Sequence, residues 1–370
     1  MKIAVNAVLA YEQPRGIGNY LNIILPALAD IDKTNEYYIY YGRWMRNYIF
    51  TGIKQDNFHL IELDMNNSQV GRNLFLSVRL PLMVRRLKAD IYWLPDSRAT
   101  LIKPCRVVST IHDLAEYVVP EKYSPIVAFV RRTYLKRQVA ISDHIITVSD
   151  YSGKDLCSRF GLSGDMITVI PLALNKRTYR IQHPDAVQDY FLFVGEIERA
   201  KNLNVLIRAY IQLDKEIRDR FELRIVGKKG NNYEEILSMV RDAGIEDRVR
   251  FCGYLSDEEL DEMYLHAYAF VFPSLFEGFG FPVLEAMTRG VPVICSDSSS
   301  IPEVGGDAVL TFEPNDDRAL AGHLSELIMN KEHRNRLAAQ GIDRSRHFNT
   351  DTLARNTLEV LDRTGTESSG

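Results

Sequence analysis

Short apolar runs alternate with amphipathic segments along the whole chain. In the first half, continuous apolar runs at 91–94 and 107–111 predict buried strands, and the segments 19–29, 74–87 and 125–141 predict helices. Runs without polar alternation are typical of parallel strands that are covered on both faces. The pattern therefore predicts an α/β fold built on a doubly wound parallel sheet.

The second half repeats this alternation with clearer boundaries. Strand-like runs at 190–195 and 223–227 each end in Gly, the helical segment 203–214 lies between them, and a last strand is expected at 309–312. We therefore expect two Rossmann-like domains that face each other across a cleft, which is the default ligand site. The expected ranges are 1–175, 186–345, and a C-terminal helix in 346–370 that crosses back to the first domain and ends in a frayed tail.

Length and charge agree with two domains of different character. At about 150 residues per domain, 370 residues predict roughly two domains. The 46% hydrophobic and 25% charged residues exclude a disordered, collagen-like or fibrous chain, and the net charge of −4 argues against nucleic acid as a partner. However, residues 1–185 hold 24 Lys and Arg against 17 Asp and Glu, whereas the remainder holds 21 against 32. Halves of opposite charge indicate different partners.

Signals for secretion, membrane spanning and metal binding are missing from the sequence. Residues 1–6 are strand-like, so we expect no signal peptide, and the apolar runs fall short of the about 18 residues of a spanning helix. The four cysteines have no paired spacing and the eight His form no cluster, which favours reduced thiols and no bound metal. We expect a cytoplasmic protein.

The densest chemical signal follows the predicted strand 269–272. Gly278 and Gly280 allow backbone N–H groups to approach a ligand closely, directly before a predicted helix. The N-terminus of that helix suits a diphosphate, because its free N–H groups and its dipole favour anions. Glu277 and Glu285 flank this position, and carboxylate oxygens accept hydrogen bonds from sugar hydroxyl groups. One Glu here would be only a helix-start charge; two around this turn favour a binding site.

This segment resembles the signature of the family-4 retaining glycosyltransferases of the GT-B fold, in which seven residues separate two Glu. The resemblance covers essentially the whole chain and is strongest over 190–312. It implies that Glu277 contacts hydroxyl groups of the transferred sugar and that Glu285 contacts the nucleotide ribose. The backbone amides implied to reach the sugar or diphosphate are those of Gly278, Phe279, Gly280 and Phe281.

The resemblance assigns further donor contacts in the second half. Basic residues at a helix start can clamp a diphosphate, and the family usually has Arg directly before Lys at this point. Here Ala200 occupies that position, so Lys201 carries over directly, whereas Arg199 either takes the role from one place earlier or points elsewhere. A later strand and loop resemble the base-binding segment of the family, with backbone groups near Tyr254 and Leu255 at the base.

Two motifs in the first half of the chain also match the family. Gly16 and Gly18 form a Gly-x-Gly segment within 11–20, and similar transferases have a Gly-rich loop here, near the donor diphosphate and the acceptor. Leu21 replaces the third Gly of the dinucleotide fingerprint, which weakens a nicotinamide interpretation. The resemblance also implies that His112 lies under the transferred sugar. His112 and Glu277 are therefore the candidate catalytic residues.

Two basic clusters, at 79–88 and 131–137, lie in predicted helices of the positively charged half. Either cluster alone is typical of a solvated helix face, but an amphipathic basic helix can also lie on an anionic membrane. In similar enzymes the first domain binds the acceptor, often a polyprenyl-diphosphate glycan. We therefore hypothesise peripheral contact with the inner face of the plasma membrane.

Together these features predict a retaining, metal-independent glycosyltransferase that moves a hexose from a nucleotide sugar to a glycan or lipid-linked saccharide. Segments 197–203 and 300–308 resemble bacterial mannosyltransferases of surface polysaccharide and lipopolysaccharide assembly, so we expect GDP-mannose as the donor substrate and no cofactor. The alternatives are another UDP- or GDP-sugar, a sugar-nucleotide epimerase of the same fold, a nicotinamide-dependent enzyme and an inactive binding partner. Product analysis with the donor alone separates an epimerase from a transferase.

Overall fold

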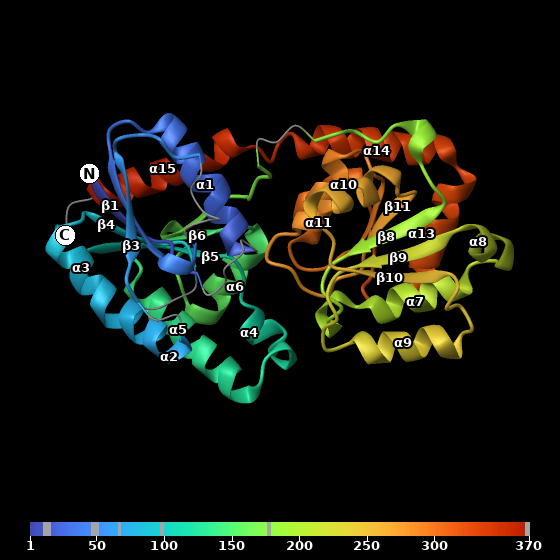
Figure 1. Ribbon diagram of the computed structural model, residues 1–370, viewed down its shortest axis with the longest axis horizontal. Coiled ribbons are helices and arrows are strands. Elements are labelled where there is room, and N and C mark those ends of the chain that lie inside the picture. Colours follow the sequence, from blue (N-terminus) through green and yellow to red (C-terminus); the bar gives the residue numbers. More distant parts are fainter. Residues whose placement is uncertain (10–15, 46–51, 66–67, 97–99, 176–178, 367–370) are drawn as a thin grey trace. The chain divides into compact units, whose positions relative to one another are not determined.

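The computed structural model describes the whole chain except residues 10–15, 46–51, 66–67, 97–99, 176–178 and 367–370. The chain divides into two compact units. The first unit consists of Met1–Lys176 and Phe348–Gly370, and the second of Arg177–His347. Each unit is a parallel sheet with helices on both faces, so the predicted doubly wound α/β fold class is confirmed (Figure 1).

The sheet of the first unit contains, in chain order, β1 (Lys2–Asn6), β2 (Glu36–Gly42), β3 (Phe58–Leu63), β4 (Ile91–Leu94), β5 (Arg106–Ile111), β6 (His144–Thr147) and β7 (Ile167–Val169). Among the described residues their spatial order is β3-β2-β1-β4-β5-β6-β7. The central strands β4 and β6 are buried at every position, which explains their continuous apolar runs. The apolar pattern misses both edge strands, β3 and β7, because several of their positions are only half-buried and polar residues are tolerated there.

The helices of the first unit are α1 (Ile17–Ile31), α2 (Gln69–Leu74), α3 (Leu80–Leu87), α4 (Ala115–Val118), α5 (Pro125–Ile141), α6 (Asp150–Phe160) and α15 (Thr350–Thr366). The predicted helix 74–87 is in fact α2 and α3 joined by a π-helical turn at Phe75–Arg79. The C-terminal helix α15 packs against α1 (Figure 1). Asn35 fixes this contact by donating a hydrogen bond of 3.0 Å to Asp362.

The sheet of the second unit contains β8 (Tyr190–Val194), β9 (Glu222–Val226), β10 (Val249–Gly253), β11 (Ala269–Phe272), β12 (Val293–Ser296) and β13 (Leu310–Phe312). In the part of the chain that the structure describes, their order is β10-β9-β8-β11-β12-β13. The helices are α7 (Leu203–Gln212), α8 (Lys215–Arg220), α9 (Tyr233–Asp242), α10 (Asp257–His266), α11 (Phe281–Thr288), α12 (Ile301–Gly305), α13 (Asp317–Met329) and α14 (Lys331–Ser345). In Figure 1, α10 and α11 cover one face of this sheet, and α7 and α9 cover the other.

Two glycines hold the carboxyl ends of the second sheet close together. A Cβ atom on Gly227 would lie 1.8 Å from the carbonyl oxygen of Gly195, so only glycine fits after β9. The N–H of Gly227 donates to the carbonyl of Gly253, and the N–H of Gly195 donates to that of Val226. The ends of β8, β9 and β10 are therefore fixed side by side, at the edge where ligands of such sheets bind.

Candidate functional site

The second unit has its topological switch point between β8 and β11. These strands are neighbours, but the chain continues from β8 to β9 on one side and from β11 to β12 on the other. Open α/β sheets bind ligands at such points, outside the carboxyl ends of the strands. After β8 the chain forms a short 3₁₀ turn at Arg199–Lys201, and after β11 it leads into α11. The two segments are joined directly, because the N–H of Leu275 donates to the carbonyl of Ala200 over 2.8 Å.

Lys201 and Glu277 form an ion pair across this switch point. The Lys201 Nζ atom lies 2.5 Å from Glu277 Oε1, and the two side chains are only 18% and 16% exposed. The hydroxyl of Ser274 donates to the same carboxylate oxygen over 2.6 Å. Among the described residues no group donates to Glu277 Oε2. One carboxylate oxygen is thus held by protein groups, and the other is available to a ligand hydroxyl.

The start of α11 presents backbone N–H groups beside this ion pair. Gly280 caps the helix with a φ of 113°, in the left-handed region that favours glycine. In the described part of the chain, the N–H groups of Gly278 and Gly280 donate to no protein acceptor. The rings of Phe279 and Phe281 pack edge to face at 5.5 Å between their centroids. The turn therefore combines a positive helix end, a lysine and free N–H groups, which is the requirement for an anion site.

Glu285 lies one helical turn further along α11 and is part of a larger network. The buried hydroxyl of Tyr264 donates to Glu285 Oε2 over 3.1 Å. Arg289 donates to the backbone carbonyl of Glu285 and pairs with Asp261 at 2.7 Å. Burial raises the pKa of Glu285, whereas Arg289 and the hydrogen bond from Tyr264 act in the opposite direction. Glu285 is thus a partly buried carboxylate whose charge depends on its two neighbours.

The remaining candidates of the second unit follow the same sheet edge. Arg199 does not join Lys201: its side chain is 64% exposed, and its Nη2 atom lies 3.9 Å from Glu235 Oε2 of α9. Tyr254 follows β10, is 63% exposed, and has the ammonium group of Lys228 5.2 Å above its ring. Leu255 is half-buried beside it. The structure therefore brings Lys201, Glu277 and the α11 turn together, and places Arg199 in a separate contact.

Three candidates belong to the first unit. Gly16 is the N-cap of α1 with a φ of 49°, and Gly18 is buried in the first turn of that helix; the preceding part of the motif, 11–15, lies outside the described residues. His112 follows β5, its Nε2 atom lies 3.0 Å from the carbonyl oxygen of Pro95, and its ring packs on the edge of Tyr20 of α1. Burial lowers the pKa of His112, so the imidazole is neutral at neutral pH. Since a carbonyl only accepts, Nε2 carries the proton and Nδ1 can accept one from a hydroxyl.

Several residues that shape the site are not predicted from the sequence. Ser274 lies in the motif segment, three positions before Glu277, and this spacing could have indicated a contact between the two side chains. Tyr264 and Arg289 reach Glu285 from α10 and from the residue after α11. Tyr264 is separated from Glu285 by 21 positions, and nothing in the local pattern indicates their contact.

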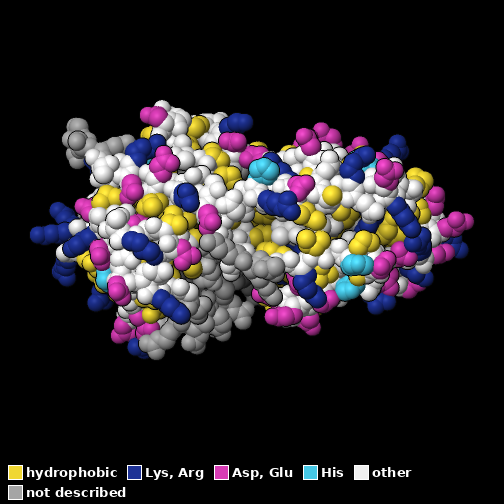
Figure 2. Space-filling model, turned by 90° about the horizontal axis from the view of Figure 1, so that it is seen from above, with side chains coloured by type: hydrophobic (Ala, Val, Ile, Leu, Met, Phe, Trp, Pro, Cys, Tyr) yellow, Lys and Arg dark blue, Asp and Glu magenta, His cyan; other side chains and the backbone are white. Residues whose placement is uncertain are grey.

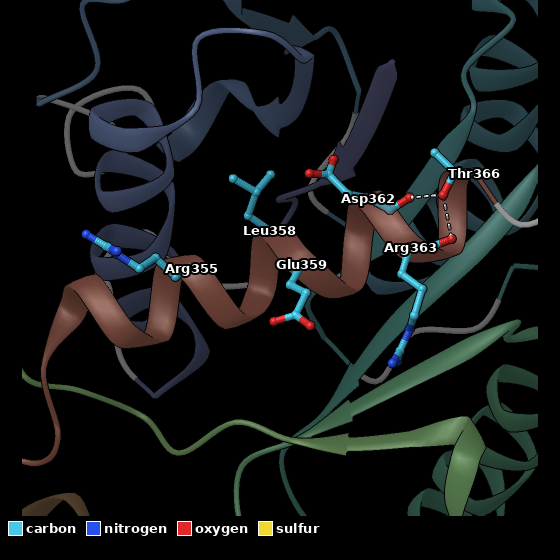
Figure 3. Close-up of a pocket in the computed structure, with 6 residues that line it drawn as sticks. All are labelled: Arg355, Leu358, Glu359, Asp362, Arg363 and Thr366. Carbon is cyan, nitrogen blue, oxygen red and sulfur yellow. Dashed lines mark hydrogen bonds between the residues drawn. The ribbon is translucent and has the colours of Figure 1, made fainter.

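Other candidate features lie outside this site. Within the described residues no group of three or more His, Cys, Asp and Glu is placed to hold a metal ion, and no helix is long and apolar enough to cross a membrane. Figure 3 shows a pocket along α15 that is lined by Arg355, Leu358, Glu359, Asp362, Arg363 and Thr366. Arg363 contacts His144, and Asp362 accepts from Asn35, so two of these groups serve to pack α15 on the first unit.

Two family models match consecutive parts of this chain. The model described as "Glycosyltransferase Family 4" matches residues 38–176, and the model described as "Glycosyl transferases group 1" matches residues 176–344. The chain is also 33% identical to the O-antigen chain mannosyltransferase B of Escherichia coli over 69% of this chain and 70% of that relative. The chain belongs to the family-4 glycosyltransferases. A second relative of this glycosyltransferase, the O-antigen chain mannosyltransferase RfbU of Salmonella typhimurium, is 34% identical over 57% of each chain.

Solved structures support the fold of this glycosyltransferase. The Anabaena protein HepE in complex with UDP and glucose is 18% identical, has a TM-score of 0.75, and matches 98% of this chain and all of its own. The lipopolysaccharide outer core galactosyltransferase WaaB has a TM-score of 0.70 at 18% identity, over 98% of this chain and all of that chain. These likenesses confirm the predicted GT-B class of two Rossmann-like units.

The hydrogen bond from Tyr264 to Glu285 generates a prediction about charge. An O–H that donates to a carboxylate favours its charged form, so Tyr264→Phe should raise the pKa of Glu285 further above the ordinary Glu value. Titration of the Glu285 carboxyl carbon by NMR measures this directly. Tyr268→Phe is the control, because that hydroxyl donates to the carbonyl of Leu327 instead. An unchanged or lower pKa in Tyr264→Phe would contradict the assigned contact.

Proposed function

We propose that this glycosyltransferase transfers mannose from GDP-mannose to a glycan or lipid-linked saccharide during polysaccharide biosynthesis. The observation that carries the proposal is the switch point of the second unit, where Lys201, Glu277 and the α11 N-terminus meet. A diphosphate needs positive charge and N–H donors, and a sugar needs carboxylate acceptors. Mannose as the transferred sugar is supported by the two relatives named as O-antigen chain mannosyltransferases.

The reaction needs a leaving group that accepts charge. The bond between C1 of the sugar and the diphosphate oxygen breaks, and an acceptor oxygen forms the new bond to C1. The acceptor proton passes to the leaving diphosphate in the front-face route that the family resemblance implies, with retention of configuration. The ammonium of Lys201 and the N–H groups of Gly278 and Gly280 would stabilise the negative charge that develops on the diphosphate. This arrangement supplies the positive charge without a metal ion.

We assign the two carboxylates to different parts of the donor. Glu277 Oε2 is the acceptor that we propose for hydroxyl groups of the mannose, and Glu285 is the one for the ribose. Glu285 keeps a hydrogen bond from Tyr264, so it would accept from the ribose through its remaining lone pairs. Tyr254 and Leu255, after β10, are proposed to lie at the base. His112 Nδ1 is proposed as a further acceptor for the sugar.

The first unit carries the surface that we propose for an anionic membrane. Residues 69–88 contain five Lys and Arg, residues 124–141 contain four, and neither segment contains Asp or Glu. Arg85, Arg86 and Lys88, at the end of α3, are exposed. Figure 2 shows Lys and Arg side chains gathered at one end of the first unit. Each basic residue near anionic lipid contributes roughly 1 kcal/mol of attraction.

The start of α5 adds apolar side chains to this basic surface. Ile126 and Phe129 are 78% and 70% exposed, and Val127 and Val130 are also exposed. Leu101, likewise exposed, links α5 to the π-helical turn: its N–H donates to Ser77, and its carbonyl accepts from Arg137. Exposed apolar groups next to a surplus of basic side chains are the combination that binds an anionic bilayer. A location at the inner face of the plasma membrane brings the enzyme to a lipid-linked acceptor.

Substitution of Glu277 tests the donor site. Glu277→Gln should reduce mannose transfer to a small residual rate, because Ser274 holds the amide oxygen and the NH2 group, which only donates, replaces Oε2 at the sugar. The same change should tighten binding of GDP several-fold, since Lys201 no longer pairs with Glu277 and is free for the diphosphate. Transfer of labelled mannose from GDP-mannose to a bacterial lipid extract gives the first readout, and calorimetry with GDP gives the second. Glu246→Gln, an exposed position, is the control. Near-normal transfer by Glu277→Gln would refute the assigned role.

Vesicle co-sedimentation tests the membrane surface. The protein should bind vesicles of equal parts phosphatidylglycerol and phosphatidylethanolamine at low salt, and bind phosphatidylcholine vesicles much less. Ile126→Ser with Phe129→Ser should weaken binding at least tenfold. Met329→Ser removes an equally exposed apolar group from the second unit and should have no effect. Absence of binding to the anionic vesicles, or equal loss in the Met329→Ser control, would overturn the proposed surface.

A further inference from the structure

We infer that Ser274, Ser299 and Ser300 are positioning residues that fix Glu277 for contact with the transferred sugar. The inference rests on the proposed function, because Glu277 is taken to bind that sugar. It goes beyond the motif, since the serines come from two different loops, one after β11 and one after β12. Each makes a hydrogen bond to a different part of Glu277.

The side chain of Glu277 is held by Ser274. The Ser274 side chain is fully buried, and its hydroxyl proton has its closest acceptor in Glu277 Oε1, at 2.6 Å; the carbonyl of Ala200 is further away, at 3.1 Å. Lys201 contacts the same oxygen. With Oε1 fixed from two sides the carboxylate cannot rotate freely, so Oε2 keeps one direction. Such preorganisation is what a sugar-binding carboxylate needs.

The backbone of Glu277 is held by the serines that follow β12. The N–H of Glu277 donates to the Ser299 hydroxyl over 2.9 Å. The Ser300 hydroxyl, also fully buried, lies 2.9 Å from the carbonyl of Glu277 and 3.0 Å from that of Phe279. With these carbonyls directed towards the β12 loop, the N–H groups of Gly278 and Gly280 are left for the ligand. The hydrogen bonds with the three serines therefore orient the Glu277 carboxylate and the anion-binding N–H groups together.

Backbone strain at Ser299 supports this function. Its φ is 52°, in the left-handed region where a side chain costs free energy. Glycine would adopt this conformation without cost, but glycine has no hydroxyl to accept the Glu277 N–H. Ser299 is therefore kept in a strained conformation in which its hydroxyl accepts the Glu277 N–H. We attribute this strain to its role in positioning Glu277.

A double-mutant cycle tests the inference, with release of GDP from GDP-mannose in the presence of the lipid extract as the readout. Ser274→Ala should lower kcat by roughly tenfold or more, because it removes a hydrogen bond to a charged group. The Kd for GDP alone should stay within about twofold, since the serine acts on the sugar contact. In a Glu277→Gln background the same change should have no further effect on the residual rate, because Ser274 acts through Glu277. Ser325→Ala removes a helical hydroxyl of α13, away from the site, and is the control.

Three results would show that Ser274 does not act by positioning Glu277. A normal kcat in Ser274→Ala, an equal loss in the Glu277→Gln background, or a loss of GDP affinity parallel to that of kcat overturns the inference. If Ser274→Ala fails to fold, Ser274→Cys provides the same test, because a thiol of similar size is only a weak hydrogen-bond donor, and the same split between kcat and GDP affinity is expected. Ser299→Gly should lower kcat while leaving the Tm nearly unchanged, because relief of the backbone strain offsets the lost hydrogen bond to the Glu277 N–H. A wild-type protein that releases no GDP overturns the proposed function itself.

Discussion

The site of this glycosyltransferase depends on one ion pair, between Lys201 and Glu277. It joins the turn after β8 to the turn after β11, at the point where the strand order of the second sheet reverses. The ion pair compensates two charges that are largely buried in these turns. It also places the Lys201 ammonium group beside the N-terminus of α11. The close approach of Gly227 to Gly195 and the bond from Leu275 to Ala200 hold the sheet edge in the shape that this pair requires.

Local charge matters more here than the charge of the whole unit. The second half of the chain carries a large excess of Asp and Glu, yet it contains the candidate diphosphate site. One lysine and the N–H groups of the α11 turn supply positive charge at short range, where the distant carboxylates are screened by solvent. The basic first half has the complementary composition, with exposed basic side chains of α3 and α5 on its surface. The division of charge thus separates a proposed donor-binding unit from a proposed acceptor and membrane unit.

The sequence predicts the parts of the fold that are buried on both faces and misses those that are not. Strands such as β4 and β11 are continuous apolar runs, so the hydrophobic pattern locates them. The edge strand β3 is only partly buried and its apolar run is interrupted by His59 and Glu62, so the same pattern does not locate it. In the candidate site, Glu277, Glu285 and Lys201 are indicated by motif and spacing. Tyr264, Ser299 and Ser300 are not, because they reach the site from separate loops and helices that only the folded sheet brings together. Arg199, left open by the sequence, contacts Glu235 instead.

We propose that the carboxyl edge of the second sheet binds a nucleoside diphosphate sugar with guanine as its base. Calorimetric titration of the whole protein with GDP-mannose, GDP, UDP, ADP and NAD tests it most directly. We expect the lowest Kd for GDP and GDP-mannose, and a loss of at least tenfold in affinity for both ligands in Lys201→Ala. Binding of NAD but of no nucleoside diphosphate, or binding that is unaffected by Lys201→Ala, would contradict it.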